Sequence, residues 1–473
     1  MTGKTSVITK EQLDIQLAFC DKVKAYWHST GTTPTAYVET YGCQQNEADS
    51  ERIRGILIES GYAIVGEAEG ADVVVMNTCA IREHAEQRVF GNLGALTHTK
   101  RRHPGQKIFL CGCMAGQEVV VNRIKNSYPH VDGVFSTHHL WQFPEILSRV
   151  LLTGKRTFFT EDEAGSIAEG LPQNRDSGLK AWVSIMYGCN NFCTYCIVPY
   201  VRGRERSRKW EDILAECKAL VESGVKDITL LGQNVNSYGK DLDQGVDFAD
   251  LLAKIAQLPG DFLIRFMTSH PRDASKKLFD TMAKYPKIAK QLHLPFQSGS
   301  SRVLKAMNRH YDREKYLEAV NYAKSVMPEL VLTSDVIVGF PGETEAEFEE
   351  TISLVEQVQY DSLFTFIFSP RPGTPAYTME DPTPKAEKNR RFDRLCAVQN
   401  GISEELHNAY IGKTLRCLID GKDKEFLTAR TEGGRLVRLT GDDSLIGTFA
   451  PITITGATTW SLKGRMEDDG NQV

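Results

Sequence analysis

Gly-Cys-Asn-Asn-Phe-Cys-Thr-Tyr-Cys, residues 188–196, is the stretch that decides how this chain is interpreted. It spaces three cysteines as C-x-x-x-C-x-x-C directly after an apolar run. Three thiolates can hold a metal centre but leave one position of a four-coordinate site open. On a four-iron cluster the open position is an iron atom that a small molecule can bind. A zinc knuckle, or three unconnected buried thiols, is the alternative interpretation of such a short motif.

Length and composition indicate an ordinary globular protein with several domains. The chain has 473 residues, which predicts about three hydrophobic cores. Its 41% hydrophobic and 25% charged residues are typical of globular chains. We find no run of 18 or more apolar residues and no basic-then-apolar amino terminus, so we expect neither a membrane span nor a signal peptide. Eleven cysteines, an odd number, favour a reducing compartment, the cytoplasm, over a disulfide framework.

Strand and helix patterns alternate from residue 35 onwards. Extended apolar runs separated by helical patterns predict a doubly wound parallel sheet with helices on both faces. The predicted strands are 36–40, 72–76 and 107–110, and a polar helix over 11–28 precedes them.

One cysteine follows each of these strands within a few residues: Cys43, Cys79 and Cys113. Right-handed crossovers make the strands parallel, so the three thiols are expected at one edge of the sheet, where ligands of such sheets gather. Two alternatives stay open. The cysteines can be small buried hydrophobes, and Cys111 can replace Cys113 because a two-residue step in extended backbone returns to the same face.

A second alternating region predicts six strand-helix units, enough for a partial barrel with its active site at the carboxyl ends of the strands. The cysteine loop follows the first strand, on that side. One continuous helix is expected over 301–327, and 154–178 is expected to be a linker. The predicted strands are 182–186, 227–231, 262–267, 291–295, 332–338 and 362–368.

Beyond Tyr410, short β-branched segments with Gly turns predict a small antiparallel β-barrel of about sixty residues. This end is the basic part of a chain of net charge -5, with nine Lys or Arg and six Asp or Glu between 409 and 466. The expected class is therefore α/β: an amino-terminal doubly wound parallel-sheet domain, a central partial (βα)6 barrel and a carboxy-terminal β-barrel. The expected boundaries are 1–34 for an extension, 35–153, 175–407 and 408–472.

Four sequence words in a fixed order resemble those of the methylthiotransferases in the radical S-adenosylmethionine (SAM) superfamily. The resemblance covers nearly the whole chain from about Thr35, and the terminal barrel is similar to the TRAM-type RNA-binding module of that family. Gly116 and Gln45 depart from the family pattern, where Gln and Met are expected. The words are Thr-Tyr-Gly-Cys-Gln-Gln-Asn at 40–46, Asn-Thr-Cys-Ala-Ile-Arg-Glu at 77–83, Gly-Cys-Met-Ala at 112–115, and residues 188–196 with Arg-Gly-Arg-Glu-Arg-Ser-Arg at 202–208.

This resemblance implies two four-iron, four-sulfur clusters. Cys189, Cys193 and Cys196 are expected to hold the cluster that cleaves SAM. Cys43, Cys79 and Cys113 are expected to hold an auxiliary cluster that delivers sulfur. The remaining expected SAM contacts follow the strand ends, where a turn hydrogen bond is the alternative for any one residue. They are Tyr195, Gln233, Asn234, Ser269, His270, Gln297, Ser298 and the run from Asp335 to Gly342.

Four arginines within seven residues, Arg202, Arg204, Arg206 and Arg208, lie just past the cysteine loop. A charge run is most often a solvated face. Beside the predicted mouth of the barrel, however, Arg can pair with phosphate or stack on an exposed base, so we expect these four to contact RNA.

The family resemblance implies that a methylthio group is inserted at C2 of an adenosine, with one SAM as radical source and a second as methyl donor. The words around Cys43, Cys79 and Gln233 favour N6-dimethylallyladenosine at position 37 of a tRNA anticodon stem-loop. Alternatives are the threonylcarbamoyl form of this adenosine, an aspartate of a ribosomal protein, or a non-catalytic RNA-binding protein with structural metal. We further expect an external electron donor, no membrane partner and a monomer.

Overall fold

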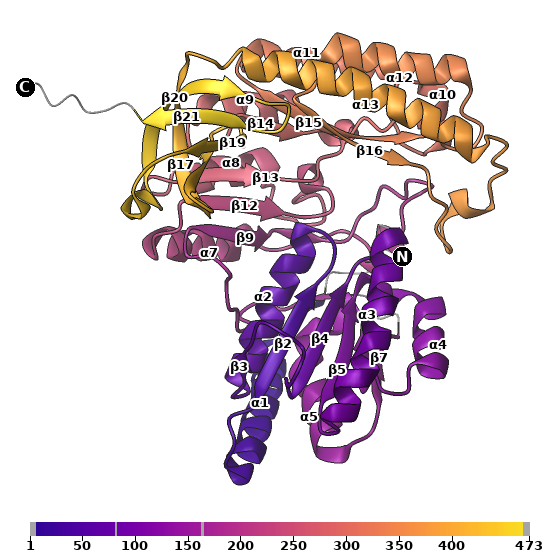
Figure 1. Cartoon of the computed structure of the whole chain (residues 1–473), viewed down its shortest axis with the longest axis vertical. Coiled ribbons are helices and arrows are strands. Elements are labelled where there is room, and N and C mark those ends of the chain that lie inside the picture. Colours follow the sequence, from indigo (N-terminus) through magenta and orange to yellow (C-terminus); the bar gives the residue numbers. More distant parts are fainter. Residues whose placement is uncertain (1–5, 81–82, 162–164, 467–473) are drawn as a thin grey trace, which may run out of the picture.

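The computed structural model describes residues 6–80, 83–161 and 165–466, which form three units (Figure 1). The amino-terminal unit is a six-stranded sheet in the order β3-β2-β4-β5-β6-β7, and all its pairs are parallel. Its strands are β2 (Thr35–Thr40), β3 (Ala63–Ile64), β4 (Val73–Thr78), β5 (Lys107–Gly112), β6 (Gly133–Phe135) and β7 (Thr157–Phe159). Its helices are α1 (Lys10–Thr30), α2 (Gln44–Glu59), α3 (Glu83–Arg102), α4 (Glu118–Ser127) and α5 (Phe143–Thr153).

Strand β4 shows why this sheet carries helices on both faces. Val73 and Val75 belong to the core that contains residues of α1, α2 and α5, whereas Val74 and Met76 belong to the core that contains residues of α3 and α4. Successive side chains of a strand point to opposite faces, so an all-apolar strand must be covered twice. The doubly wound prediction is therefore confirmed.

Two expectations about the edges of this unit are wrong. The expected linker, 154–178, contains β7, which extends the sheet beside β6, and β8 (Ser166–Ile167), which pairs with β1 (Ser6–Val7). The expected extension is also part of the unit, because α1 buries Cys20 and Val23 in the same core as α5. Short strands are poorly marked in sequence because tertiary packing decides them.

The central unit contains the six predicted strand-helix units. Two parallel three-stranded sheets, β13-β12-β9 and β14-β15-β16, follow one another and are joined by an isolated bridge between Ile264 and Ile288. The strands are β9 (Lys180–Ser184), β12 (Asp227–Leu231), β13 (Leu263–Phe266), β14 (Gln291–His293), β15 (Val331–Val338) and β16 (Ser362–Ile367). The helices are α7 (Trp210–Glu222), α8 (Phe248–Ala256), α9 (Lys276–Lys284), α10 (Ser301–Ala306), α11 (Arg313–Val326), α12 (Glu345–Val358) and α13 (Lys385–Asn408).

The single helix expected over 301–327 is wrong. It is divided into α10 and α11 by residues 307–312, where Asn308 and His310 have φ of 58° and 59°. Asp312 then caps α11 by accepting a hydrogen bond from the Lys315 amide, at 2.9 Å. The left-handed residues are of the types that tolerate this conformation best, and they turn the segment between them towards the cysteine loop.

Smaller elements complete the three units. β10 (Met186–Tyr187) pairs antiparallel with β11 (Arg206–Ser207), and α6 (Val198–Val201) follows the cysteine loop. The 3-10 helices are η1 (Cys113–Gly116), η2 (Thr137–Gln142), η3 (Val235–Ser237), η4 (Pro271–Asp273), η5 (Pro375–Thr378) and η6 (Asp443–Leu445). No helix of the described residues is long and apolar enough to cross a membrane.

The carboxy-terminal unit is the predicted small barrel. It closes in the order β17-β18-β19-β21-β20, and its pairs are antiparallel except β19 with β21. The strands are β17 (Thr414–Asp423), β18 (Phe426–Thr431), β19 (Leu436–Leu439), β20 (Phe449–Ala457) and β21 (Leu462–Met466).

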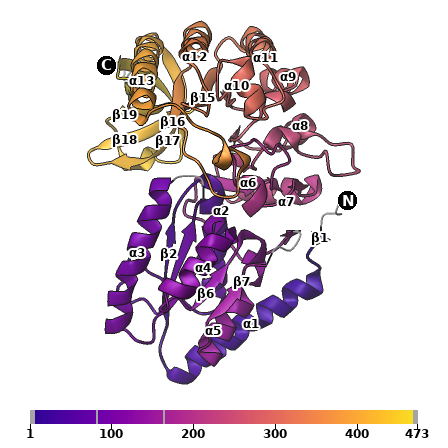
Figure 2. The same ribbon diagram turned by 90° about the vertical axis from the view of Figure 1, so that its right-hand side faces the viewer.

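This barrel packs against the amino-terminal ends of the central strands. Arg435 forms a buried ion pair with Asp361, just before β16, and a Cβ at Gly433 would lie 2.2 Å from Val331 at the start of β15. The amino-terminal unit lies on another side of the central unit, and α2 approaches α6 there (Figure 2). The two outer units therefore flank the central one at different places.

Candidate metal and cofactor site

The cysteine loop of the central unit is anchored at its first residues. Gly188 has φ of +75°, and a Cβ there would lie 2.0 Å from the Arg204 carbonyl oxygen, so only glycine fits. The Gly188 amide donates to Gln233 Oε1 at 2.6 Å, and the Cys189 amide donates to the Gly203 carbonyl at 3.1 Å. Gln233, expected to contact SAM, thus holds the loop itself.

The three thiols of this loop form one group, in which Cys189 and Cys193 are buried and Cys196 is partly buried. Burial raises the pKa of Cys189 to about 12, and nearby Cys193 adds to this effect. The pKa of Cys196 is also raised, first by burial and then by Cys193 and Cys189. Three thiolates so close together would repel one another, which is why neighbouring thiols raise the pKa of Cys189 and Cys196. A bound metal centre neutralises these negative charges and so removes the electrostatic cost.

Among the described residues, no three His, Cys, Asp or Glu side chains are close enough together to hold one metal ion. Three thiolates can each bind a different iron of a four-iron cluster and leave the fourth iron without a protein ligand, so the residue types of this loop suit such a cluster. All eleven cysteines lie in the described residues and none is in a disulfide.

Arg309 is a residue that the sequence did not single out. It lies in the break between α10 and α11, is 5% exposed, and donates to Cys193 Sγ at 3.3 Å and to Tyr195 Oη at 3.4 Å. Its other bonds go to the Pro295 carbonyl and the Tyr311 hydroxyl. Among the described residues no carboxylate pairs with it, so a positive charge is buried against the thiol group.

Strand ends beside this loop carry buried polar atoms that no described residue satisfies. Asn234 Oδ1, Ser269 Oγ and His270 Nε2 are all of this kind, and they follow β12 and β13. Burial, followed by nearby Arg309, lowers the pKa of His270, which stays neutral. Unpaired buried polar groups are costly, so their concentration here fits a polar ligand such as the methionine part of SAM.

The other expected SAM contacts lie after β14 and within β15. Gln297 has φ of +67° and donates its amide to the Asp335 carbonyl at 2.9 Å. Ser298 Oγ accepts the Ser300 amide at 3.2 Å, and Asp335 lies 3.5 Å from His293. These residues share one side of the barrel, as predicted, but most already have partners in the protein.

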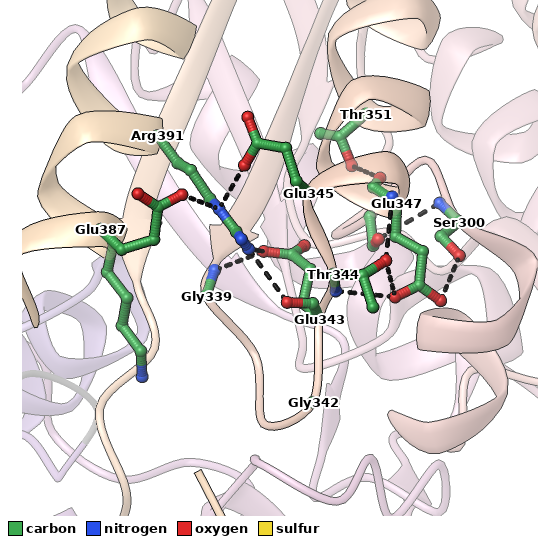
Figure 3. Close-up of polar contacts among 12 residues, drawn as sticks. Ser300, Gly339, Gly342, Glu343, Thr344, Glu345, Glu347, Thr351, Glu387 and Arg391 are labelled. Carbon is green, nitrogen blue, oxygen red and sulfur yellow. Dashed lines mark hydrogen bonds and ion pairs between the residues drawn. The ribbon is translucent and has the colours of Figure 1, made fainter. Parts of the chain in front are cut away.

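The turn after β15 is held by a carboxylate network (Figure 3). The Gly339 amide donates to Glu343 Oε2 at 2.7 Å, and Arg391 of α13 donates to the Glu343 carbonyl at 3.0 Å. Burial raises the pKa of Glu343 to about 7. Thr344 caps α12 in a reciprocal box with Glu347. The network fixes the 339–342 turn, and its Glu343, Glu347 and Arg391 are buried.

The amino-terminal thiols come together from three different strand ends. Cys43 caps α2, Cys79 follows β4 and Cys113 begins η1. Gly42, with φ of +123°, lies so close to Cys79 that a Cβ would be 2.5 Å from Cys79 Cβ. Arg202 donates to Cys113 Sγ at 3.2 Å, and nearby Cys43 raises the pKa of Cys113, after burial and against Arg202.

Asn46 and Asp49 of α2 complete this arrangement. Asn46 Oδ1 accepts from Cys43 Sγ at 3.4 Å and from Arg202 at 3.2 Å, and Asp49 pairs with Arg202 at 2.9 Å. Cys111, the alternative ligand, instead packs in the apolar core on the other face of the sheet. The geometry therefore supports Cys113 rather than Cys111 as the third thiol.

The two thiol groups lie at one domain junction. Helix α6, which follows Cys196, packs on η1, which begins with Cys113, and a Cβ at Gly116 would lie 3.3 Å from Val201 Cβ. Gln45 Nε2 donates to Ser184 Oγ at the end of β9, at 2.9 Å. Gly116 and Gln45, which depart from the family pattern, are thus junction residues.

The prediction that four arginines contact RNA is wrong for three of them. Arg202, Arg206 and Arg208 are 5%, 8% and 4% exposed, because they form part of the junction. Arg208 pairs with Glu169 and Glu216 at 2.6 and 2.8 Å. Arg204 alone of the four is exposed, with its guanidinium 4.2 Å from the centre of the Phe192 ring. The sequence pattern predicts an RNA-contacting surface for this charge run, whereas in the structure three of its arginines are buried at the domain junction.

Models of three protein families match the chain. They are described as Radical SAM superfamily, over residues 183–355, Uncharacterized protein family UPF0004, over 35–136, and TRAM domain, over 408–466. These matches coincide with the central, amino-terminal and carboxy-terminal units.

Similar proteins of known name cover nearly the full chain. A "tRNA-2-methylthio-N(6)-dimethylallyladenosine synthase" from Acetivibrio thermocellus is 46% identical over 98% of both chains. Proteins of the same name from Clostridium botulinum (strain Langeland) and Alkaliphilus oremlandii are 50% and 47% identical, over 90% and 97% of this chain and 96% and 98% of theirs.

A solved structure supports the fold. The radical S-adenosylmethionine methyltransferase TsrM from Kitasatospora setae, with tryptophan and a SAM analogue bound, aligns with a TM-score of 0.55 over 73% of this chain and 75% of that one. At 13% identity this likeness speaks for the fold alone.

Proposed function

Because the chain belongs to the tRNA-2-methylthio-N(6)-dimethylallyladenosine synthase family of radical SAM proteins, we propose that it inserts a methylthio group at C2 of N6-dimethylallyladenosine in tRNA. The position is expected to be 37, in the anticodon loop. The overall change breaks the C2–H bond and forms a C–S bond. The hydrogen leaves in 5'-deoxyadenosine, which separates from methionine, and the residues of the auxiliary site would hold the sulfur that is inserted. A second SAM gives the methyl group and leaves as S-adenosylhomocysteine, and an external donor supplies electrons.

One observation carries this proposal: two separate thiol trios lie at a single domain junction. Cys189, Cys193 and Cys196 would hold the cluster that binds SAM. Cys43, Cys79 and Cys113 would hold the auxiliary cluster. Helix α6 connects the first trio to the residues that contact the second, so a base bound at the junction has both within reach.

When bound, the two clusters and SAM supply one-electron chemistry at an unactivated C–H bond, which acid-base side chains cannot provide. The chain's own residues place and enclose these groups. Gln233 and Gly188 fix the core loop, Asn234 and Ser269 offer polar atoms to SAM, and Arg309 places a positive charge at Cys193. The eleven free cysteines suit a reducing compartment, for which we propose the cytoplasm.

RNA contacts are proposed at two separate places. Arg204 and Phe192 are next to the cysteine loop, where a guanidinium over a ring can stack with a base. On the terminal barrel, Trp460 is 76% exposed in the turn between β20 and β21, with Lys463 three residues further on. Exposed aromatics beside cations are typical of single-stranded RNA contacts. Trp460 was not singled out from the sequence.

Mass spectrometry of tRNA nucleosides tests the proposal. A strain that lacks this protein should lose the 2-methylthio form and accumulate N6-dimethylallyladenosine, and the full chain should restore it. Accumulation of the threonylcarbamoyl nucleoside instead would favour the sister activity. Iron and acid-labile sulfide on anaerobically prepared protein should correspond to two clusters, whereas zinc alone would support a non-catalytic RNA-binding protein.

A further inference from the structure

A cavity of about 40 Å³ lies at the junction behind the two thiol trios. Its walls come from both units: Asp49 and Arg52 of α2, His138 of η2, Tyr187 of β10, and Arg202 and Arg206 from the segment after α6. Tyr187 precedes Cys189 by two residues, and Arg202 contacts Cys113. The cavity is therefore adjacent to both thiol-bearing segments.

The charges around the cavity are predominantly positive. Three guanidinium groups line it, against one carboxylate, Asp49, which already accepts from Arg202. Behind them, Glu216 is engaged by Arg208 and Arg175, and Asp241, near Arg206, accepts the Ser207 amide. Burial and nearby Arg206 lower the pKa of His138 to about 4, so this ring is neutral and adds no charge.

One buried donor in this cavity, Arg206 Nε, lacks a hydrogen-bond partner within the described residues. Arg206 is more than nine-tenths buried, its Nη atoms donate to backbone carbonyls, and its Nε has no hydrogen-bond partner. Arg52 is partly exposed, makes no hydrogen bond among the described residues and has the Asp49 carboxylate 3.8 Å away. A buried guanidinium donor without an acceptor, as at Arg206 Nε, is costly, and an anion would satisfy it.

Size restricts the ligand. One water needs about 10–15 Å³ measured in this way, so the cavity has room for an ion of only a few atoms. The cavity is partly open to solvent, and its inner space has room for a small inorganic anion.

We propose that this cavity is a binding site for a small inorganic anion, held between Arg52 and Arg206. The second step of the inference rests on the proposed function: sulfur must reach the trio that contains Cys113, and Arg202 lines the cavity and contacts that thiol. Hydrosulfide is the smallest anion that carries sulfur, and it is the occupant that we assign.

Bromide is the probe for the site, because it scatters X-rays anomalously. Crystals of the full, cluster-loaded chain, prepared without oxygen, should show a bromide peak within hydrogen-bond distance of Arg52 and Arg206. Bromide only at the outer surface would overturn the site.

Arg52→Gln removes one charge from a side chain that makes no hydrogen bond, so the fold should be retained. Bromide binding should weaken about tenfold or more, as expected for a charge-assisted contact. Arg204→Gln, at an exposed arginine two residues before Arg206, is the matched control and should keep the peak. Equal occupancy in both variants would contradict the proposal.

Competition between anions tests whether the site prefers hydrosulfide to chloride. Hydrosulfide should displace bromide at a lower concentration than chloride does. If chloride displaces it equally well, the assignment of sulfur is overturned. A failure of the proposed function would appear in the nucleoside profile and would leave the bromide peak unchanged, so the two failures are distinguishable.

Discussion

The two thiol trios use the same residue type but are assembled differently. The core trio comes from one nine-residue loop, 188–196, fixed by local hydrogen bonds. The amino-terminal trio comes from three strand ends, and its contacts depend on Arg202 from the neighbouring unit. A local site survives wherever its loop folds, whereas a composite site needs the domain junction as well.

The buried arginines of the two sites differ in the same way. Arg202 at Cys113 is neutralised by Asp49, at 2.9 Å. Arg309 at Cys193 has no carboxylate partner among residues that the structure describes, so no carboxylate offsets the effect of its charge on the thiol group. We infer that the core site is built to stabilise added negative charge, as a reduced cluster requires.

Cysteine substitutions should produce the largest difference between the two sites. Cys193→Ala should abolish formation of 5'-deoxyadenosine from SAM, because the remaining two thiols cannot hold the core cluster. Cys113→Ala should retain SAM cleavage but lose the methylthio nucleoside, and each variant should lose about one cluster of iron. Liquid chromatography with mass spectrometry measures both products. Cys111→Ala is the control, and loss of sulfur insertion in that variant would show that our third ligand is wrong.

The two arginines allow a sharper electrostatic test. Arg309→Met should make reduction of the core cluster about tenfold less favourable, which for one electron is about 60 mV. The double variant Arg202→Met/Asp49→Asn removes two opposite charges and should change the potential of the auxiliary cluster much less. Redox titration followed by electron paramagnetic resonance measures both potentials. Equal shifts in the two proteins would remove the distinction drawn between the sites.

Gly116→Val tests whether the composite site depends on the junction. A larger side chain would press on Val201, whose Cβ is 3.3 Å from the position of the new Cβ, at a cost of about 1–3 kcal/mol. SAM cleavage should stay close to normal while methylthio transfer falls severalfold. Gly94→Ala, in α3 with open space around it, is the matched control. If cleavage and transfer fell together, the two sites would not be separable in this way.

The smallest effect on activity is expected from Glu343, which supports the turn beside the core site. Its pKa in the folded protein is about 7, above the ordinary value of 4.5, so the folded state binds the proton more tightly. The corresponding stability is present below pH 4.5 and is lost as the pH rises through 7, by up to about 3 kcal/mol. Glu343→Gln should flatten this dependence. Urea unfolding between pH 5 and 8 measures it, and parallel curves for the two proteins would contradict the prediction.

Sequence reasoning succeeded where spacing and periodicity are local. The cysteine loop, the six central strands and the terminal barrel follow from patterns within a few residues. It also located Cys43, Cys79 and Cys113 at one sheet edge, because the handedness of crossovers constrains topology. Arg309 was missed, since nothing in a helical pattern over 301–327 marks the break that brings it to Cys193. Arg202, Arg206 and Arg208 were misassigned because sequence does not reveal which charges a domain interface buries.

The terminal barrel lies at the far end of the central strands from the cysteine loop. Its contacts include Val331 and Asp361 at the starts of β15 and β16 and Lys180 at the start of β9, whereas the 339–342 turn lies at the other end of β15. An eight-residue strand is about 26 Å long. A single nucleic acid touched by both ends must bridge at least this span along the outside of the protein. The distance between the two ends of the protein therefore sets a minimum length for an RNA that contacts both. We expect an isolated hairpin loop to contact only one of them.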